Sequence, residues 1–147
     1  MAKQNGIGKT TFVEELLAAV ATGTGFLGFA ASGKPTSVLY VDGELPAHYA
    51  KNLLERLIVR SPEPEPLATN FHYIGPNDVK DGLMPDISTE DGQKTIDAWV
   101  NETEAKIVCF DALQTLSRSG DPNGVEGFRP VQGTVRGKLL EAKVAVT

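Results

Sequence analysis

The sequence lacks the features that mark secreted, membrane-spanning and nucleic-acid-coating proteins. It has one cysteine, Cys109, so no disulfide can form within the chain, which fits a reducing compartment. No apolar stretch approaches the roughly 20 residues of a membrane-spanning helix, and the Gly-rich polar residues after Met1 are unlike a signal peptide. The net charge of −5 argues against a general coat for nucleic acid. We therefore expect a soluble, cytoplasmic protein with no membrane partner.

Several functional motifs are missing as well. The sequence has no zinc-type cluster, no nucleophile elbow and no N/T-K-x-D motif of the kind with which GTPases read guanine. His48 and His72 stand without partner residues at ligand spacing, so we interpret both as surface or packing residues. The chain is ordinary in composition, with 147 residues of which 41% are hydrophobic and 22% charged, and this predicts a single domain.

Apolar patterning predicts helices and strands in alternation. The expected order is a helix over 10–22, a strand over 37–41, a helix opened by Pro46, a strand over 71–74, a helix capped by Ser88, a strand over 106–110, a helix from Pro130 and a strand over 143–147. The stretch Ser61–Pro66 predicts a stiff connector that is neither helix nor strand. Alternating elements of this kind indicate an α/β fold, with a mostly parallel sheet covered on both faces.

The helical period also predicts which side chains are buried. In the first helix Glu14 and Glu15 should face away from an apolar stripe of Phe12, Leu16, Leu17 and Val20. In the helix after Pro46 the stripe comprises Tyr49, Leu53, Leu54, Leu57 and Ile58. The helix after Ser88 should bury Ile96, Trp99 and Val100. Cys109 lies in the apolar run 107–110, where a small buried core residue is expected.

The most informative stretch is Gly6-Ile7-Gly8-Lys9-Thr10-Thr11, just before the first helix. Glycines let successive backbone N–H groups point at one anion, and the helix adds its positive N-terminal end. Lys9 can reach the β- and γ-phosphates of a nucleotide, and the Thr10 hydroxyl can ligate Mg²⁺. The match to G-x-x-x-x-G-K-[ST] is partial, because Lys3 stands where the first glycine belongs. The expected nucleotide-binding residues are Asn5, Gly6, Ile7, Gly8, Lys9, Thr10 and Thr11.

Two acidic positions complete the expected site. Asp111 follows an apolar strand, as a Walker B carboxylate for Mg²⁺ does. Asp42 and Glu44 leave the carboxyl end of the 37–41 strand, the edge at which open α/β sheets bind ligands. Glu44 there can activate water as a catalytic base. The alternatives are that Asp111 caps a turn, that Asp42 and Glu44 are solvated loop acids, or that Glu44 caps the next helix.

These motifs in this order resemble the RecA-like P-loop ATPases of the AAA class. The residues that carry the resemblance are the phosphate loop, VLYVDGELP at 38–46, LLERL at 53–57 and IVCFDALQTL at 107–116. Together they are similar to the RepA-type hexameric helicases and their plasmid and phage relatives. The resemblance implies a three-layer α/β/α P-loop NTPase that binds ATP and Mg²⁺ and acts in DNA replication or a related DNA transaction.

The resemblance also assigns roles to single residues. It implies that Lys9 and Thr10 bind phosphate and Mg²⁺, that Asp111 is the Walker B aspartate, that Glu44 activates water and that Gln114 senses nucleotide. Relatives form rings in which a neighbouring subunit supplies an arginine finger, and Arg118, Arg129 and Arg136 are all candidates for it. The implied strand order is 70–74, 37–42, 106–111 and 143–147.

The chain also departs from the family pattern. No hydrophobic strand precedes the phosphate loop, and the sequence stops at Thr147, before the polar residues that follow the last strand in relatives. We therefore expect residues 1–147 to be one partial RecA-like domain with weak nucleotide affinity and little turnover. Two alternatives stay open: a nucleotide-binding fragment without catalytic activity, and a small-molecule or nucleotide kinase. The second is disfavoured because no Arg-rich lid segment is present.

Overall fold

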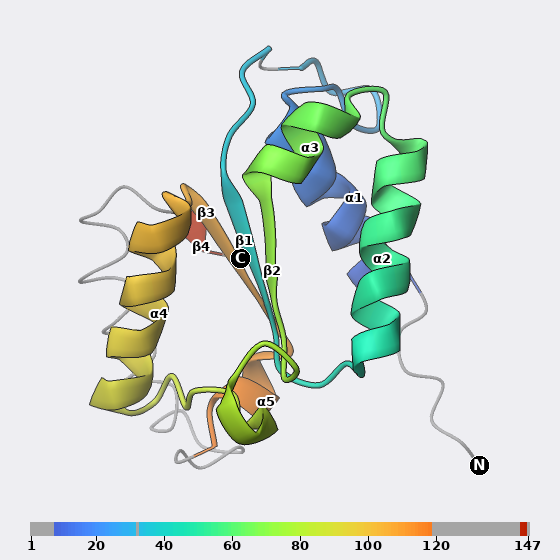
Figure 1. The fold of residues 1–147 in the computed structure, drawn as a ribbon. Coiled ribbons are helices and arrows are strands. Elements are labelled where there is room, and N and C mark those ends of the chain that lie inside the picture. Colours follow the sequence, from blue (N-terminus) through green and yellow to red (C-terminus); the bar gives the residue numbers. More distant parts are fainter. Residues whose placement is uncertain (1–7, 32, 119–144, 147) are drawn as a thin grey trace.

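The computed structural model shows helices packed around one sheet (Figure 1). It describes residues 8–31, 33–118 and 145–146. The elements are α1 (Lys9–Thr22), β1 (Val38–Asp42), α2 (Ala47–Arg60), α3 (Pro64–Asn70), β2 (Phe71–Ile74), the 3₁₀ turn η1 (Lys80–Gly82), α4 (Glu90–Thr103), β3 (Ile107–Asp111), α5 (Leu113–Leu116) and β4 (Ala145–Val146). Within the described residues, no helix has the length and apolar character that crossing a bilayer requires.

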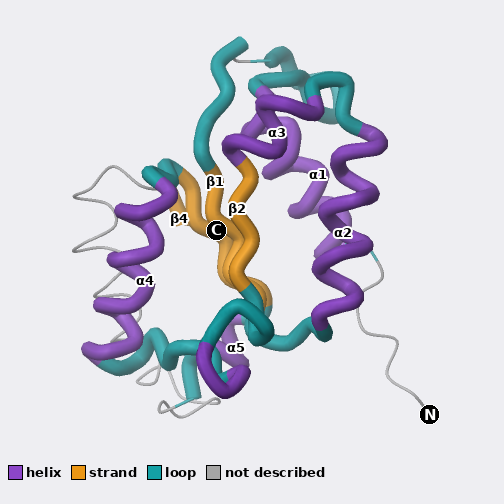
Figure 2. Tube along the Cα trace, in the orientation of Figure 1, coloured by secondary structure: helices purple, strands orange, loops and turns teal. Residues whose placement is uncertain are grey.

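The described strands form a four-stranded parallel sheet in the order β2-β1-β3-β4. This is the order that the family resemblance implies. Figure 2 shows the strands at the centre of the molecule, with helices on both sides of them. Val38 of β1 pairs with Phe71 of β2 and with Ile107 of β3. At the other end of the register Asp42 pairs with Asp111, so the two acids leave adjacent strands at the same carboxyl edge.

Alternate residues of β1 pack on opposite faces of the sheet, where they join two separate core clusters. Leu39 and Val41 belong to a cluster that includes Ile96 and Val100 of α4. Val38 and Tyr40 belong to a second cluster, formed with α1, α2 and α3. Figure 1 shows the same division, with α4 on one side of the sheet and α1, α2 and α3 on the other. The predicted three-layer α/β/α class is confirmed.

The buried face of α1 differs from the predicted one. Glu14, Leu17 and Ala21 face the core with exposed fractions of 0%, 2% and 0%, whereas Phe12 and Leu16 of the predicted stripe are exposed. The buried positions are three and four residues apart, so they still follow one helical face. A carboxylate is tolerated there because Arg56 of α2 reaches it with a guanidinium nitrogen 2.5 Å from Glu14 Oε2. The prediction that Glu14 faces away from the core is wrong.

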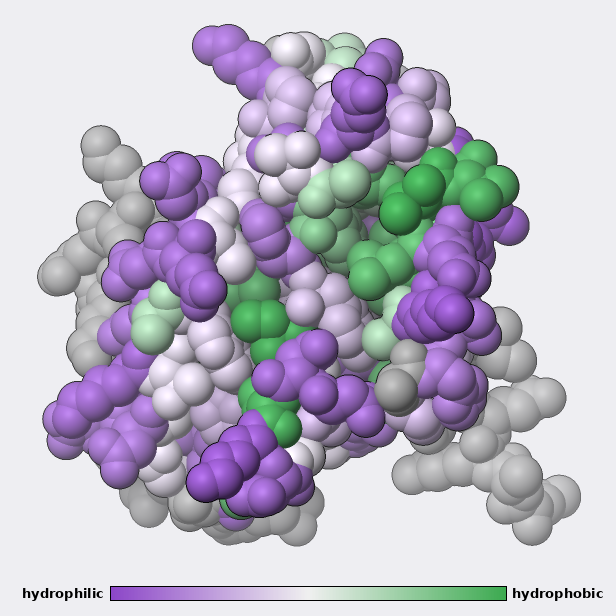
Figure 3. Space-filling view, in the orientation of Figure 1, coloured by the Kyte–Doolittle hydropathy of each residue, from purple (hydrophilic) through white to green (hydrophobic). Residues whose placement is uncertain are grey.

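In α2 the predicted apolar stripe is buried only in part. Leu53 and Leu57 lie in the core and Leu54 packs against it, while Ile58 is 44% exposed. Val59, next to Ile58, is 84% exposed. Figure 3 shows hydrophobic surface gathered over this end of α2.

The stretch Ser61–Pro66 contains a helix start that the sequence pattern does not predict, because α3 begins inside it at Pro64. Proline fits here because the first N–H groups of a helix have no partner within it, and the proline ring already holds a helical φ. The helix buries Leu67 in the cluster on the α1 side of the sheet. The prediction of a connector without helix is therefore wrong for its second half.

Smaller differences concern the edges of elements. The cap of α4 is Thr89 rather than Ser88, and its hydroxyl accepts a hydrogen bond from the N–H of Gly92 at 3.1 Å. Ser88 donates instead to the carboxylate of Asp86. The short helix α5 is not among the predicted elements. The helix expected from Pro130 lies outside the described residues, while β4 falls inside the predicted last strand.

Candidate functional site

The chain turns into α1 at Gly8, where the phosphate loop is expected to end. Gly8 has φ +113° and ψ −22°, and its carbonyl accepts a hydrogen bond from the N–H of Phe12 at 2.9 Å. A side chain at this φ would be strained, so the position favours glycine. Among the residues that the structure describes, no side chain caps the start of α1, so its first N–H groups can donate to an anion. Asn5, Gly6, Ile7 and the side chain of Lys9 lie outside what the structure describes.

Thr10 and Asp111 are 101 residues apart in the chain and meet in space. The Thr10 hydroxyl donates a hydrogen bond to Asp111 Oδ2 at 3.2 Å. The same oxygen accepts a second hydrogen bond from the hydroxyl of Tyr40 at 2.5 Å. Burial and the neighbouring Asp111 raise the pKa of Tyr40, so this phenol stays protonated at neutral pH and acts as a donor. The residues predicted to hold Mg²⁺ are thus adjacent.

The segment that follows β1 is held in place by the Asp42 side chain. Asp42 is 1% exposed, and its Oδ1 accepts hydrogen bonds from the N–H groups of Glu44 at 2.8 Å and Leu45 at 3.0 Å. Its Oδ2 accepts one from the Tyr73 hydroxyl at 2.7 Å. Asp42 is therefore not a solvated loop acid. It shapes the backbone turn that carries Glu44.

Gly43 fits this turn because there is no room for a side chain. Its N–H donates to the carbonyl of Asp111 at 2.7 Å, which ties the turn to the end of β3. A Cβ added to Gly43 would collide with Thr115 Oγ1 and lie 3.1 Å from the Cγ of Leu116. Helix α5 therefore packs directly on the backbone of the turn, and the Asp-Gly-Glu sequence depends on the glycine.

A cavity of about 170 Å³ opens where these segments meet. Glu44 lines it as an exposed side chain, which is the placement expected of a group that meets water. The full lining comprises Thr10, Asp42, Glu44, Leu45, Tyr49, Asp111 and Ala112. The site thus combines a phosphate-loop helix, two strand-end acids and a third acid at the surface.

The donor set fits Mg²⁺, which prefers oxygen ligands and is commonly held by one or two carboxylates together with substrate phosphates. The Thr10 hydroxyl and the Asp111 carboxylate are such ligands, and the hydrogen bond between them brings the two groups to one place. A family model described as an AAA domain matches residues 2–136.

The chain belongs to this AAA-domain family. It is accordingly a RecA-like P-loop ATPase by fold and class, with an ATPase-type nucleotide-binding function of the kind that typically uses Mg²⁺. No curated protein and no solved structure matched the chain. The family match supports this class of function.

Two features of this AAA domain's site differ from what sequence reasoning singles out. Tyr49 lines the cavity, although the sequence pattern predicts it only as part of the apolar stripe of α2. Its position in the first turn of the helix that follows Glu44 is the signal that could have identified it. Gln114, the candidate sensor, is exposed on α5 and is not among the lining residues.

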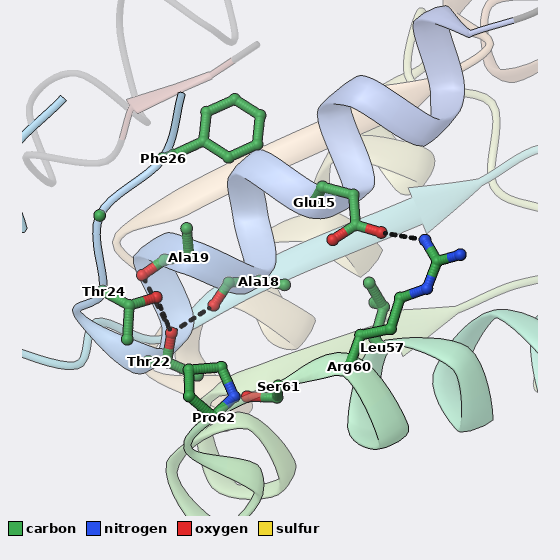
Figure 4. A pocket seen from close by; sticks show the side chains of 11 residues that line it. Glu15, Ala18, Ala19, Thr22, Thr24, Phe26, Leu57, Arg60, Ser61 and Pro62 are labelled. Atoms are coloured by element: carbon green, nitrogen blue, oxygen red, sulfur yellow. Dashed lines mark hydrogen bonds and ion pairs between the residues drawn. The ribbon is translucent and has the colours of Figure 1, made fainter. Parts of the chain in front are cut away.

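Other cavities of the AAA domain lie away from the predicted site. One of about 200 Å³ lies between the C-terminal ends of α1 and α2 (Figure 4), where Arg60 forms an ion pair with Glu15 at 3.3 Å. Another of about 450 Å³ lies beside Ser37 and Lys106, at the amino ends of β1 and β3. No predicted site residue lines either cavity, so their larger volumes do not favour them as the nucleotide site.

Proposed function

We propose that this chain is a RecA-like motor core that binds and hydrolyses ATP with Mg²⁺. The observation that supports this most directly is the hydrogen bond between Thr10 and Asp111, in a cavity that Glu44 also lines. Phosphoryl transfer to water requires three parts: a loop that binds the phosphates, a ligand for the metal ion and an acid that activates water. We take residues 1–147 as one ATPase unit.

The phosphates of ATP would lie at the start of α1. In this proposal the backbone from Asn5 to Thr11 surrounds them, and Lys9 bonds the β- and γ-phosphates. The Thr10 hydroxyl and the Asp111 carboxylate would hold Mg²⁺, which when bound neutralises charge on those phosphates. The left-handed Gly8 supports the cradle, because it turns the chain sharply into the helix.

Glu44 is the proposed base. Its carboxylate accepts a proton from a water molecule while the water oxygen attacks the γ-phosphorus. The bond from that phosphorus to the β–γ bridging oxygen then breaks, and ADP departs with the electron pair. Asp42 orients Glu44 through the backbone turn, since it fixes the N–H groups of Glu44 and Leu45. Gln114 is proposed as a nucleotide sensor only on the strength of the family resemblance.

We further propose, from the same resemblance, that the motor works as a ring and acts on DNA in replication or a related process. A neighbouring subunit would contribute an arginine finger. Arg118 is a weaker candidate than the sequence indicates, because its guanidinium donates to the carbonyl of Met84 at 2.5 Å. Arg129 and Arg136 lie outside the described residues.

The proposed hydrolysis is tested by phosphate release from Mg²⁺-ATP, measured for the wild type, Glu44→Gln and Glu55→Gln. Glu55 is an exposed acid of α2 that pairs with Lys51, so it serves as the matched control. We expect Glu44→Gln to lower turnover by about 10²- to 10⁴-fold with ATP binding retained, and Glu55→Gln to match the wild type. A wild type that binds ATP and releases no phosphate would support the inactive nucleotide-binding alternative instead.

A further inference from the structure

Two stacked tyrosines lie on the face of the sheet that α1 covers. Tyr40 of β1 and Tyr73 of β2 are register partners, with ring centroids 5.9 Å apart and planes inclined by 13°. Tyr40 has an exposed fraction of 0%. The rings alone would satisfy the packing of this layer, and phenylalanine would provide the same rings. The hydroxyl groups therefore need a separate explanation.

Each hydroxyl donates to an acid at the end of the neighbouring strand. Tyr40 of β1 donates to Asp111 at the end of β3, and Tyr73 of β2 donates to Asp42 at the end of β1. The two phenols thus make the same kind of contact one strand apart. The two acids serve different parts of the proposed site. Asp111, the partner of Tyr40, lies next to Thr10, whereas Asp42, the partner of Tyr73, holds the backbone turn that carries Glu44.

The Tyr40 contact restrains the carboxylate in a specific way. Both hydrogen bonds that described residues give to the Asp111 side chain fall on Oδ2, one from Tyr40 and one from Thr10. A carboxylate that is anchored through one oxygen keeps a fixed plane, and its second oxygen then points in a fixed direction. Within the described part of the chain no hydrogen bond reaches Oδ1, so this oxygen is available to a cation while Oδ2 stays anchored.

We propose that Tyr40 is a positioning residue that orients the Asp111 carboxylate for a divalent cation bound with the nucleotide. The proposal rests on the proposed function, because it assigns Tyr40 a part in the same site. Tyr40 acts through Asp111 and touches neither nucleotide nor cation. The competing explanation is that the hydroxyl only provides a hydrogen-bond donor to a partly buried acid and so contributes to folding alone.

The two explanations predict different effects of Tyr40→Phe on how strongly the affinity for ATP depends on Mg²⁺. ATP affinity is measured by calorimetry with Mg²⁺ and again with EDTA, for the wild type, Tyr40→Phe and Tyr73→Phe, and urea unfolding is measured alongside. We expect Tyr40→Phe to reduce the gain in ATP affinity that Mg²⁺ provides by about 10-fold, as loss of an outer-shell partner does. Its affinity in EDTA should stay within about 2-fold of the wild type. Tyr73→Phe, the matched control, should keep the full Mg²⁺ gain.

A second variant covers the case in which Tyr40→Phe does not fold because the Asp111 carboxylate loses one of its two hydrogen-bond donors. Asp111→Asn removes the charge, and Tyr40→Phe is then added to it. If Tyr40 acts through Asp111, the double variant has the same Mg²⁺ gain as Asp111→Asn alone.

Three results overturn the proposal. Tyr40→Phe could keep the wild-type Mg²⁺ gain, Tyr73→Phe could lose as much of it as Tyr40→Phe does, or the double variant could lose more than Asp111→Asn. In each of these cases the proposed function stands. A wild type that binds no ATP overturns the proposed function itself, and the role of Tyr40 with it.

Discussion

Arg56 of α2 donates a hydrogen bond to the buried carboxylate of Glu14 of α1, and so joins the helix after the phosphate loop to the helix after Glu44. The Glu14 side chain is 0% exposed and that of Arg56 is 32% exposed. Within the described residues, Glu14 Oε1 and Arg56 Nε have no hydrogen-bond partner. A buried pair with atoms left over adds little net stability, but losing one partner leaves an uncompensated charge.

Arg56→Met should therefore destabilise the fold strongly. We expect a loss in the free energy of unfolding on the order of 3 kcal/mol at neutral pH, measured by urea denaturation. Arg60→Met is the matched control, since Arg60 lies one helical turn further along α2 and pairs with Glu15, a partly exposed acid of α1. That change should cost about 0–1 kcal/mol. Equal losses in the free energy of unfolding of the two variants would contradict the claim that burial of Glu14 makes its pairing with Arg56 the more important one.

The Glu14 side chain should also make the free energy of unfolding depend on pH. Burial raises the pKa of its carboxyl above the usual value of 4.5, and Arg56 only partly offsets this. The unfolded chain then loses this proton at a lower pH than the folded chain does. Glu14 therefore supports folding fully below about pH 4.5, and this contribution falls as the pH rises through the folded pKa. The free energy of unfolding of the wild type, measured against Glu14→Gln, should fall across that range. A constant or rising difference would contradict the assignment.

Gly43→Ala should disturb the turn that carries Glu44. The added Cβ would collide with Thr115 Oγ1, so α5 or the turn must move. We expect a loss of about 1–3 kcal/mol in the free energy of unfolding, from overpacking, and reduced ATP turnover. Gly28→Ala is the comparison, because a Cβ there meets no atom within 4 Å although its φ is also unfavourable. Gly28→Ala should lose some stability and keep turnover.

Asp42→Asn should lower ATP turnover while ATP binding is retained. One oxygen of Asp42 accepts two backbone N–H groups and the other accepts the Tyr73 hydroxyl, so an amide NH₂ at either place would face a donor. We expect a stability loss of about 1–3 kcal/mol and lower phosphate release, with ATP affinity retained. The exposed Asp81→Asn should change stability by less than about 0.5 kcal/mol. Asp42→Asn with full turnover would show that the turn does not position Glu44.

The parallel sheet is predictable because strands buried on both faces are continuous apolar runs, as in 107–110, whereas the strand order is implied by the family resemblance alone. The carboxyl ends of those strands then bring Asp42 and Asp111 to one edge, which follows from the strand pattern alone. Glu14 is misplaced by the pattern because periodicity treats every acid as a surface residue, while burial here depends on Arg56, 42 residues further along the chain. The cap of α4 is misplaced by one residue because Ser88 and Thr89 are both good caps.

The contacts that shape the candidate site are harder to predict. Tyr40 is a good strand former, so its sequence position indicates packing and gives no signal for the hydrogen bond to Asp111. Its role depends on the register between β1 and β3, which no local pattern specifies. For α3, the prolines indicate a helix breaker, although the first turn of a helix tolerates proline.

The most direct test of the account is a calorimetric titration of Mg²⁺-ATP into the wild type, Lys9→Ala and the surface control Lys51→Ala. We expect the wild type and Lys51→Ala to bind one nucleotide with the same affinity. Lys9→Ala should bind about 10- to 100-fold more weakly, the effect of losing a charge-assisted hydrogen bond to phosphate. A wild type that does not bind, or a Lys9→Ala variant that binds equally well, would contradict the assignment of the nucleotide site to the start of α1.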